Sequence, residues 1–369
     1  MLKKYKLKNY NFMLLISVIA AMIVGIFAIN IAAPANTTKQ ALGIVGAVAV
    51  MIILSLIDYH FICKFFIPIY ILSDILLAAV LLFGDGVNNA VRWFTFAGIT
   101  FQPSELCKIL MIIFMAQMLS HFKEKEKINS ISCIFLFLVT TAIPIFLIYK
   151  EPDLSTTLCF IGIMILMLYL AGLSYKLIGI AILILVPVTG TFIWYIQKPD
   201  QKLLYEHQVQ RILSFIYPEK YAEENLQQLN SVMAIGSGKL GGKGMHLDAA
   251  VNAASSSLIS ERQTDFIFSV IGEATGFVGS VLVIGLILFI VLECIRVARR
   301  SKDDCGMLLA GGAASLIGLQ SFINIGVATS LIPNTGIPLP FISYGLTSLL
   351  SIAICIGIVL NVSLQKKQF

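Results

Sequence analysis

The residues best suited to chemistry lie in the stretch from Glu261 to Glu273, E-R-Q-T-D-F-I-F-S-V-I-G-E, where a polar segment turns abruptly into an apolar one. Asp265 stands at the start of the apolar run, and Glu273 follows about two helical turns later. A charged carboxylate costs about 2.5 to 3.5 kcal/mol at the centre of a bilayer, so such groups mark functional sites. We therefore take Asp265 as the candidate reactive group. The alternative is a plain helix cap, because Thr and Asp at a helix start bind free N–H groups.

A second polar group opens another apolar stretch. The sequence Q-P-S-E runs from Gln102 to Glu105 and is followed by Lys108. Proline suits the first helical turn, where its missing N–H would be unpaired anyway. Glu105 and Lys108 are three residues apart and share one helix face. Either they form an internal ion pair, as buried charges normally do, or they form with Gln102 and Ser104 a polar floor beneath a substrate.

Two short turns carry groups suited to phosphate or cation chemistry. The loop G-D-G-V-N-N-A-V-R-W contains Arg92, and a guanidinium binds phosphate through two parallel hydrogen bonds, on a substrate or on a lipid headgroup. The turn E-P-D brings Glu151 and Asp153 together, and carboxylate oxygens suit hard divalent cations. Capping of the next helix is the safer interpretation for Asp153.

Two segments rich in glycine or proline add irregular backbone. Gly236 to Gly244, G-S-G-K-L-G-G-K-G, lacks the Ser or Thr of a nucleoside-triphosphate loop. A flexible, weakly basic loop that uses Lys243 to touch a lipid diphosphate is the remaining interpretation. Pro333 to Gly345, which contains Ser343, holds three prolines and two glycines. Irregular backbone at a membrane boundary is tolerated only where it is buried in protein or lines a cavity.

The composition defines the elements that must position these residues. Of 369 residues, 58% are hydrophobic and 12% are charged, whereas soluble domains carry about 25% charged residues. Ten apolar runs are each about long enough to cross a bilayer, which takes roughly 20 helical residues. Their continuous apolarity favours an all-α polytopic membrane protein over a barrel. The predicted spans are Phe12–Ile29, Ala41–Ile57, Phe65–Phe83, Gln102–Leu119, Ile131–Tyr149, Leu154–Leu170, Leu177–Ile196, Phe266–Val291, Met307–Leu331 and Phe341–Val362.

The positions of Lys and Arg predict the orientation. With both termini in the cytoplasm, fifteen of them lie in inner segments and three in short outer loops, which is a strong positive-inside bias. Residues 197–264 then form a large extracytoplasmic loop between helices seven and eight, within a single membrane domain of residues 1–369. The net charge of +6 fits this topology and gives no case for a nucleic-acid partner. The expected location is the cytoplasmic membrane.

The unusual polar groups crowd the outer ends of spans four, six, eight and ten. This predicts a cavity open to the outer leaflet, with Glu105 and Lys108 as its floor and Asp265 at its rim. The exception is Asp74 in the middle of span three, which needs a buried partner. The candidate partners are Lys108, Gln320 and Asn324.

Four separated motifs follow one another along the chain: Q-P-S-E with Lys108, E-P-D-L at 151–154, T-D-F-I-F at 264–268 with G-E at 272–273, and P-F-I-S-Y-G at 340–345. Together they resemble the motifs of the SEDS family, the membrane glycosyltransferases RodA, FtsW and SpoVE. The resemblance covers nearly the whole chain, and the glycine-rich segment is most similar to RodA. The sequence departs from the family at Ser260, where proline is common, and at Leu346, where glycine is common.

The resemblance implies a peptidoglycan glycosyltransferase that polymerises lipid II, an undecaprenyl-diphosphate-linked disaccharide peptide, on the outer face of the membrane. Such proteins serve cell elongation and shape, division or sporulation. The family's catalytic aspartate matches Asp265, its intramembrane acid and lysine match Glu105 and Lys108, and its outer-turn acid matches Asp153. The resemblance also implies a class B penicillin-binding protein as the crosslinking partner.

The residues fit this chemistry on physical grounds. Nucleotide sugars are absent outside the cell, so the donor must arrive activated by its own lipid diphosphate. Asp265, with a pKa raised by partly apolar surroundings, suits the base that takes the acceptor proton, with metal ligation as the alternative role. Positive charge on the departing diphosphate comes from Arg92, Lys243, Arg262 or a divalent cation, Mg²⁺ or Mn²⁺, held by Asp265 and Asp153.

The expected substrate cavity also includes Glu151, Glu273 and Ser343, and no Cys/His cluster suggests zinc.

Other functions stay open at this point. A lipid II flippase that forms no bond would suit ten spans and an intramembrane charge pair, but it should need polar groups in both leaflets. A third hypothesis is a non-catalytic scaffold for the transpeptidase.

Overall fold

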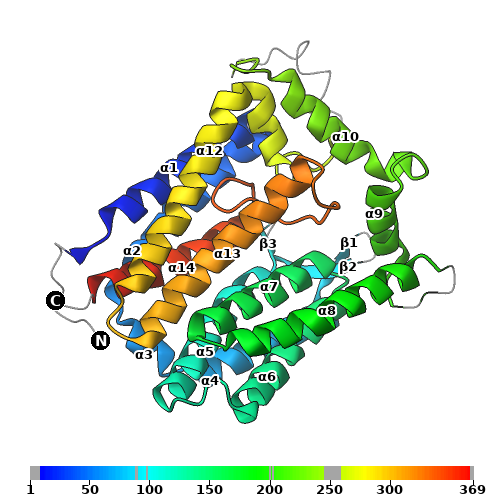
Figure 1. Cartoon of the computed structure of the whole chain (residues 1–369). Coiled ribbons are helices and arrows are strands. Elements are labelled where there is room, and N and C mark those ends of the chain that lie inside the picture. The colour runs from blue at the N-terminus through cyan, green and yellow to red at the C-terminus, as the bar shows by residue number, and fades with distance from the viewer. Residues whose placement is uncertain are drawn as a thin grey trace.

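The structure, a computed structural model, describes residues 9–87, 90–96, 99–198, 201, 203–244 and 259–365. In this part of the chain, ten helices are long and apolar enough to cross a membrane. They form one bundle (Figure 1), which confirms the predicted all-α polytopic class. The ten helices are α1 (Phe12–Ala32), α2 (Thr37–Leu56), α4 (Phe66–Phe83), α5 (Pro103–Glu124), α6 (Ile131–Lys150), α7 (Leu154–Ala171), α8 (Tyr175–Ile196), α12 (Ile267–Arg299), α13 (Asp304–Ala328) and α14 (Leu346–Leu364).

Most helix ends lie within a few residues of the predicted spans, and two of the differences have a clear physical cause. The tenth was expected to start at Phe341, but α14 begins at Leu346. Prolines at 338 and 340 interrupt backbone hydrogen bonding just before this point, so the apolar residues that follow them form a packed irregular segment. The eighth was expected to end at Val291, but α12 continues to Arg299 because arginines are well placed in a last helical turn.

The two ends of the bundle differ in content. The described chain starts and finishes at the same end of the bundle, where the backbone N–H of Asn11 donates to Ser363 Oγ at 3.3 Å. We call this the terminal end. The opposite end, which we call the site end, holds α9 (Glu206–Ile216) and α10 (Ala222–Ser237) (Figure 1). Two further short helices, η2 (Pro34–Asn36) and α3 (Tyr59–Cys63), link longer ones. The lysines at 3–8 and 366–367, which support the predicted orientation, lie outside the described residues.

A small antiparallel sheet lies between α4 and α5 and was not predicted. Its strands are β1 (Asp85–Val87), β2 (Ala90–Phe96) and β3 (Ile99–Phe101), paired in the order β1-β2-β3. The β2 sequence A-V-R-W-F-T-F is rich in the aromatic and β-branched residues that favour strands. This strand pattern is short and lies between two long apolar runs, so it was not recognised in the sequence. The sheet carries Arg92 at the site end.

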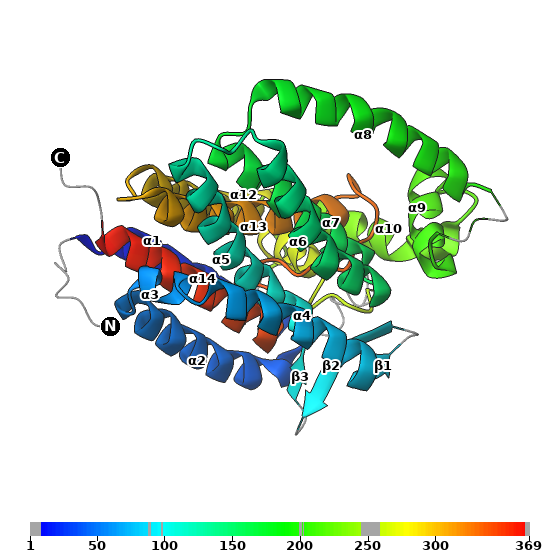
Figure 2. The same cartoon turned by 90° about the horizontal axis from the view of Figure 1, so that it is seen from below.

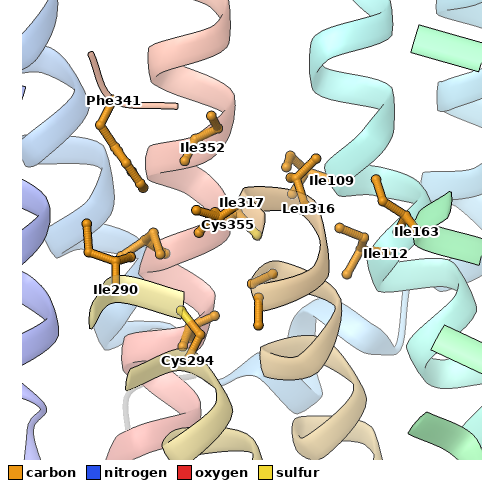
Figure 3. Packing of buried hydrophobic residues seen from close by; sticks show 14 of the residues in the cluster. Ile109, Ile112, Ile163, Ile290, Cys294, Leu316, Ile317, Phe341, Ile352 and Cys355 are labelled. Atoms are coloured by element: carbon orange, nitrogen blue, oxygen red, sulfur yellow. The ribbon is translucent and has the colours of Figure 1, made fainter. Parts of the chain in front are cut away.

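The core is built around α5, α13 and α14, whose most apolar windows are each 72% buried. Figure 3 shows Leu316 and Ile317 of α13 between α5, which contributes Ile109 and Ile112, and α14, which contributes Cys355. All five side chains are buried. These three helices therefore form the buried centre of the bundle, against which the segments that carry the site residues are packed.

One transmembrane helix stands apart from this core. Within α8 only Ile196 is buried, and Figure 2 shows the helix running along the outside of the bundle. Its continuous apolarity suits a helix whose whole circumference faces lipid, because the bilayer solvates apolar side chains on every side.

Asp74 on α4 has none of its expected partners. Lys108 pairs with Glu105, and the Asn324 amide donates to backbone carbonyl groups. Neither polar atom of the Gln320 side chain has a hydrogen-bond partner among the described residues. Asp74 is only partly buried and interacts instead with Tyr70, one helical turn earlier on α4.

α12 is interrupted at Gly276, where φ is +66° and ψ is −161°. The glycine-rich segment 236–244 fills the interruption. Phe277 N donates to Lys239 O at 2.9 Å, and Lys243 N donates to Glu273 O at 3.0 Å. Backbone groups freed by the break are thus paired, as they must be inside a membrane. Gly238 and Gly242 of this segment pack closely against the backbone of α12, where a flexible loop was expected.

The break makes a prediction about stability. A Cβ on Gly276 would lie 2.4 Å from the amide nitrogen of Gly242, and the positive φ disfavours any other residue. We expect Gly276→Ala to lower the free energy of unfolding by about 1 to 3 kcal/mol, measured by thermal unfolding in detergent. Gly285→Ala on the same helix is the control, because nothing lies within 4 Å of the added Cβ. Equal effects of the two substitutions would contradict the account.

Candidate active site

Asp265 lies in the turn before α12, with its backbone fixed from α13. The buried Asn324 donates from Nδ2 to the carbonyl oxygens of Asp265 and Ile337, each at 2.8 Å. Gly336, with φ +77°, lies against the carboxylate, because a Cβ there would be 3.2 Å from Asp265 Oδ2. α12 begins with no side-chain cap bond, so Asp265 does not serve as its N-cap. The plain capping alternative therefore has no support at this helix.

The segment 333–345 supports the Asp265 turn through Ser343. The Ser343 hydroxyl donates to Thr264 O at 2.6 Å and accepts from Leu339 N at 2.8 Å. Tyr344 N donates to Gln263 O at 2.9 Å. Ser343 is buried and bound to backbone on both sides. Its place is thus beneath the reactive turn, which it positions.

The charge of Glu261, in the same turn, and charges from two other segments act on the Asp265 carboxyl group. Burial raises the pKa of Asp265 to about 7, the Glu261 charge adds to the rise, and Arg211 of α9 opposes it. Asp153 adds a smaller contribution in the same direction as Glu261. A carboxyl group with a pKa near the working pH is well matched to proton transfer. The predicted rise in the pKa of Asp265 is thus explained by burial and by the charge of Glu261.

Arg92 and Asp153 meet at the turn between α6 and α7. Arg92 Nε donates to Glu151 O at 3.0 Å, a terminal nitrogen donates to Pro152 O, and another lies 3.9 Å from Asp153 Oδ2. Asp153 caps α7, since its Oδ1 accepts from Thr156 N at 3.0 Å. Asp153 therefore both starts a helix, as the safer interpretation held, and places a negative charge beside Arg92.

Glu151 is fully buried beside this pair. Neither carboxylate oxygen has a hydrogen-bond partner among the described residues. Burial raises the pKa of Glu151 to about 9, the charge of Asp153 adds to the rise, and Arg92 opposes it. Glu151 is therefore neutral at pH 7, so the charges of this turn are those of Arg92 and Asp153.

The polar residues of α5 lie beneath the same turn. Lys108 Nζ is 2.7 Å from Glu105 Oε1, and both side chains are buried. Gln102 Nε2 donates to Asp153 Oδ2 at 3.4 Å. Asp153 interacts electrostatically with Lys108 as well as with Asp265, so it links the α5 pair to the reactive turn. The structure thus contains the ion pair and places it as the floor of one polar cluster.

Other predicted residues take different positions. Lys243 Nζ is 2.6 Å from Glu273 Oε1, and this pair belongs to the α12 break. Ser104 is buried on α5 with no partner for its hydroxyl in the described chain. Arg262 is partly exposed, three residues before Asp265. Among the described residues, no three His, Cys, Asp or Glu side chains gather as a metal site.

Sequence reasoning missed two residues of this site. Arg211 lies on α9, which is held near the α6–α7 turn because Gln208 Nε2 donates to Pro152 O at 3.0 Å. A single arginine on an amphipathic segment looks like an ordinary solvated residue, so nothing marked it. Asn324 was noted only as a partner for Asp74. Its polar side chain in an otherwise apolar span was the available signal.

The fold and site together define a class of protein: a multi-pass membrane protein with a cluster of acidic and basic side chains at one end of its helices. Residues 4–368 match the model of the FtsW/RodA/SpoVE family, described as cell cycle proteins. The chain belongs to this family, as the four motifs predicted.

Named relatives agree on one activity. The probable peptidoglycan glycosyltransferase FtsW of Geobacter metallireducens is 32% identical, over 98% of this chain and 96% of the relative. The peptidoglycan glycosyltransferase MrdB of Escherichia coli is 31% identical, over 81% and 78%. A solved chain from a peptidoglycan synthase complex of polymerization and crosslinking superposes with a TM-score of 0.82 at 26% identity, over 96% and 97%. The predicted peptidoglycan glycosyltransferase activity is confirmed by these relationships.

The two charges that act most strongly on the pKa of Asp265 make predictions of opposite sign. If ionised Asp265 is the base, the rate of glycosyl transfer rises with pH through a midpoint near 7. Arg211→Gln removes a charge that lowers the pKa, so the midpoint moves to higher pH. Glu261→Gln removes a charge that raises it, so the midpoint moves to lower pH. The measurement is a pH–rate profile from pH 5 to 9. Shifts in the same direction would exclude Asp265 as the titrating group.

Glu151 makes a prediction about the pH dependence of stability. Its pKa is raised from 4.5 to about 9 in the folded protein, so its contribution to stability is fully present below pH 4.5 and is lost as pH rises to 9. We expect Glu151→Gln to raise Tm relative to the wild type, and by more at pH 9 than at pH 5. Glu126→Gln on an exposed turn is the control. A Tm difference independent of pH would show that Glu151 is ionised throughout.

Proposed function

We propose that this chain uses lipid II as donor and acceptor and polymerises it into glycan strands at the site end of the bundle. The observation that supports this most directly is the partly buried Asp265 at the membrane boundary, with its pKa near 7. It interacts electrostatically with Arg211, which in turn interacts with Arg92. A donor that carries a lipid tail and a diphosphate would place its anionic group at this depth.

Asp265 acts as the general base in this proposal. Its carboxylate takes the proton of the acceptor 4-hydroxyl while the oxygen forms a bond to the anomeric carbon of the donor sugar. The bond from that carbon to the diphosphate breaks, and undecaprenyl diphosphate leaves with the electron pair. The bond from Asn324 and the close approach of Gly336 support the base role, because the first fixes the backbone of Asp265 and the second limits the space open to its carboxylate.

Arg92 and Arg211 stabilise the departing diphosphate. Arg92 is oriented by the carbonyl groups of Glu151 and Pro152, which leaves part of its guanidinium for an anionic ligand. Arg211 is exposed and acts electrostatically on Asp265 and Asp153. Charge on fixed side chains is worth more than charge brought by solvent, because no reorganisation is needed during the reaction.

Binding of a divalent cation is part of the proposal, but Asp153 has little capacity left to serve as its ligand. Both Asp153 oxygens already accept hydrogen bonds, from Thr156 N and from Thr156 Oγ1 and Gln102 Nε2. These residues do not form a complete cation site, so no step of the mechanism is assigned to a metal. Of the two predicted ligands, Asp265 is the one without such bonds among the described hydrogen bonds.

The orientation and partner follow from the same proposal. Lipid II polymerised outside the cell requires the site end to face outward and both termini to lie in the cytoplasm, as the positive-inside bias predicts. A class B penicillin-binding protein is the proposed partner. The similarity to a chain from a polymerization and crosslinking complex supports it.

One assay separates this proposal from a flippase and from a scaffold. Purified protein in detergent, where no sidedness exists, is given labelled lipid II, and glycan length is measured on gels. We expect polymer from the wild type and a loss of at least about 100-fold with Asp265→Asn, the scale of a lost general base. Asp304→Asn at the terminal end, where Asp304 pairs with Lys123 at 2.8 Å, is the control. Full polymerisation by Asp265→Asn would remove the base role, and no polymer from the wild type or any variant would favour a flippase or a scaffold, neither of which forms a bond.

A further inference from the structure

A notch lies at the terminal end of the bundle, opposite the site end that holds the Asp265 turn. It is formed where the start of α1 meets the end of α12, and its volume is about 220 Å³. Its lining residues are Tyr10, Asn11, Phe12, Met13, Glu293, Arg296, Val297 and Arg300. None of them belongs to the site described above.

The one acid in the notch is already neutralised. Glu293 is buried, its Oε2 accepts from Asn11 Nδ2 at 3.0 Å, and its Oε1 accepts from Arg296. The positive charge of Arg300 is therefore left over. Arg296 also keeps donors available, because 56% of its side chain is exposed. The notch offers guanidinium donors and a net positive charge to a ligand.

The other wall of the notch is apolar. Phe12 and Met13, the first two residues of α1, are 53% and 63% exposed. The Tyr10 ring lies 5.0 Å from that of Phe12. A membrane helix starts here, so these side chains meet the bilayer at its boundary. Arginines on one wall and lipid-facing apolar side chains on the other match a ligand that is anionic at one end and apolar at the other.

We propose that this notch binds the phosphate of an anionic phospholipid from the leaflet at the terminal end. Arg296 and Arg300 donate to the phosphate oxygens, and Phe12 and Met13 contact the start of the acyl chains. Free phosphate shares the anionic chemistry, but it would leave the apolar wall without a partner. The proposal does not depend on the catalytic roles assigned above.

The experiment compares two neighbouring arginines of α12. Protein in neutral detergent is titrated with dioleoyl phosphatidylglycerol, and Tm is followed, since a ligand of the folded state raises Tm with concentration. Arg300→Gln removes a lining residue. Arg299→Gln removes the same charge one position away, on a residue that is exposed and does not line the notch. We expect wild type and Arg299→Gln to respond alike, and Arg300→Gln to need about fivefold more lipid.

Two further arms identify the ligand. Dioleoyl phosphatidylcholine tests for a general lipid effect, and inorganic phosphate at matched concentration tests for the anion alone. A Tm rise with phosphatidylglycerol only supports the proposal. Equal responses to both lipids, an equal response to inorganic phosphate, or equal losses in the two variants would overturn it. Glycosyl transfer by Arg300→Gln at wild-type rate in neutral detergent verifies that the variant is folded.

Discussion

The reactive end of the molecule depends on one buried amide. Asn324 donates from a single nitrogen to the carbonyl oxygens of Asp265 and Ile337. Both carbonyls lie in irregular backbone, and an unpaired carbonyl in a membrane costs several kcal/mol. The amide therefore ties the turn before α12 to the proline-rich segment, and Ser343 adds a second link between the same two stretches. Because α13 is part of the buried core, the backbone of Asp265 is fixed relative to the bundle.

The charges near the site divide into two kinds. Glu105 with Lys108 and Glu273 with Lys243 are close ion pairs, and their charges cancel locally. The acids outside the spans are governed by burial. Burial brings the pKa of Asp265 to about 7, while the pKa of Glu151 rises to about 9. Environments that separate two carboxyl groups in this way commonly assign them different roles. Asp265 can exchange a proton at neutral pH, whereas Glu151 keeps its own.

α12 connects the two regions to which functions are assigned. It starts directly after the Asp265 turn, is interrupted at Gly276, and ends in the arginines beside the start of α1. The interruption is stabilised by backbone bonds from the glycine-rich segment, so residues 236–244 are part of the helix packing. The first part of α12 is thereby fixed from both sides, by α13 through Asn324 and by the segment 236–244.

The sequence by itself determined the number and type of the membrane elements. Long apolar runs can satisfy their backbone in lipid only as helices, so ten spans followed from composition and length alone. The motifs also determined the family and the gathering of Asp265, Asp153 and the Glu105–Lys108 pair at one end. The number of spans follows from the local hydrophobic pattern. The gathering at one end follows because consecutive spans cross the membrane in opposite directions.

Only the tertiary structure decided which groups act on one another. Arg211 reaches Asp265 because Gln208 holds α9 against a turn some 56 residues away in sequence, and no local pattern encodes that contact. The same holds for Asn324, whose partners come from two distant segments, and for Lys243, which pairs with Glu273 at the helix break. A side chain's type is local, but its pKa and partners depend on long-range packing, which the order of residues does not display.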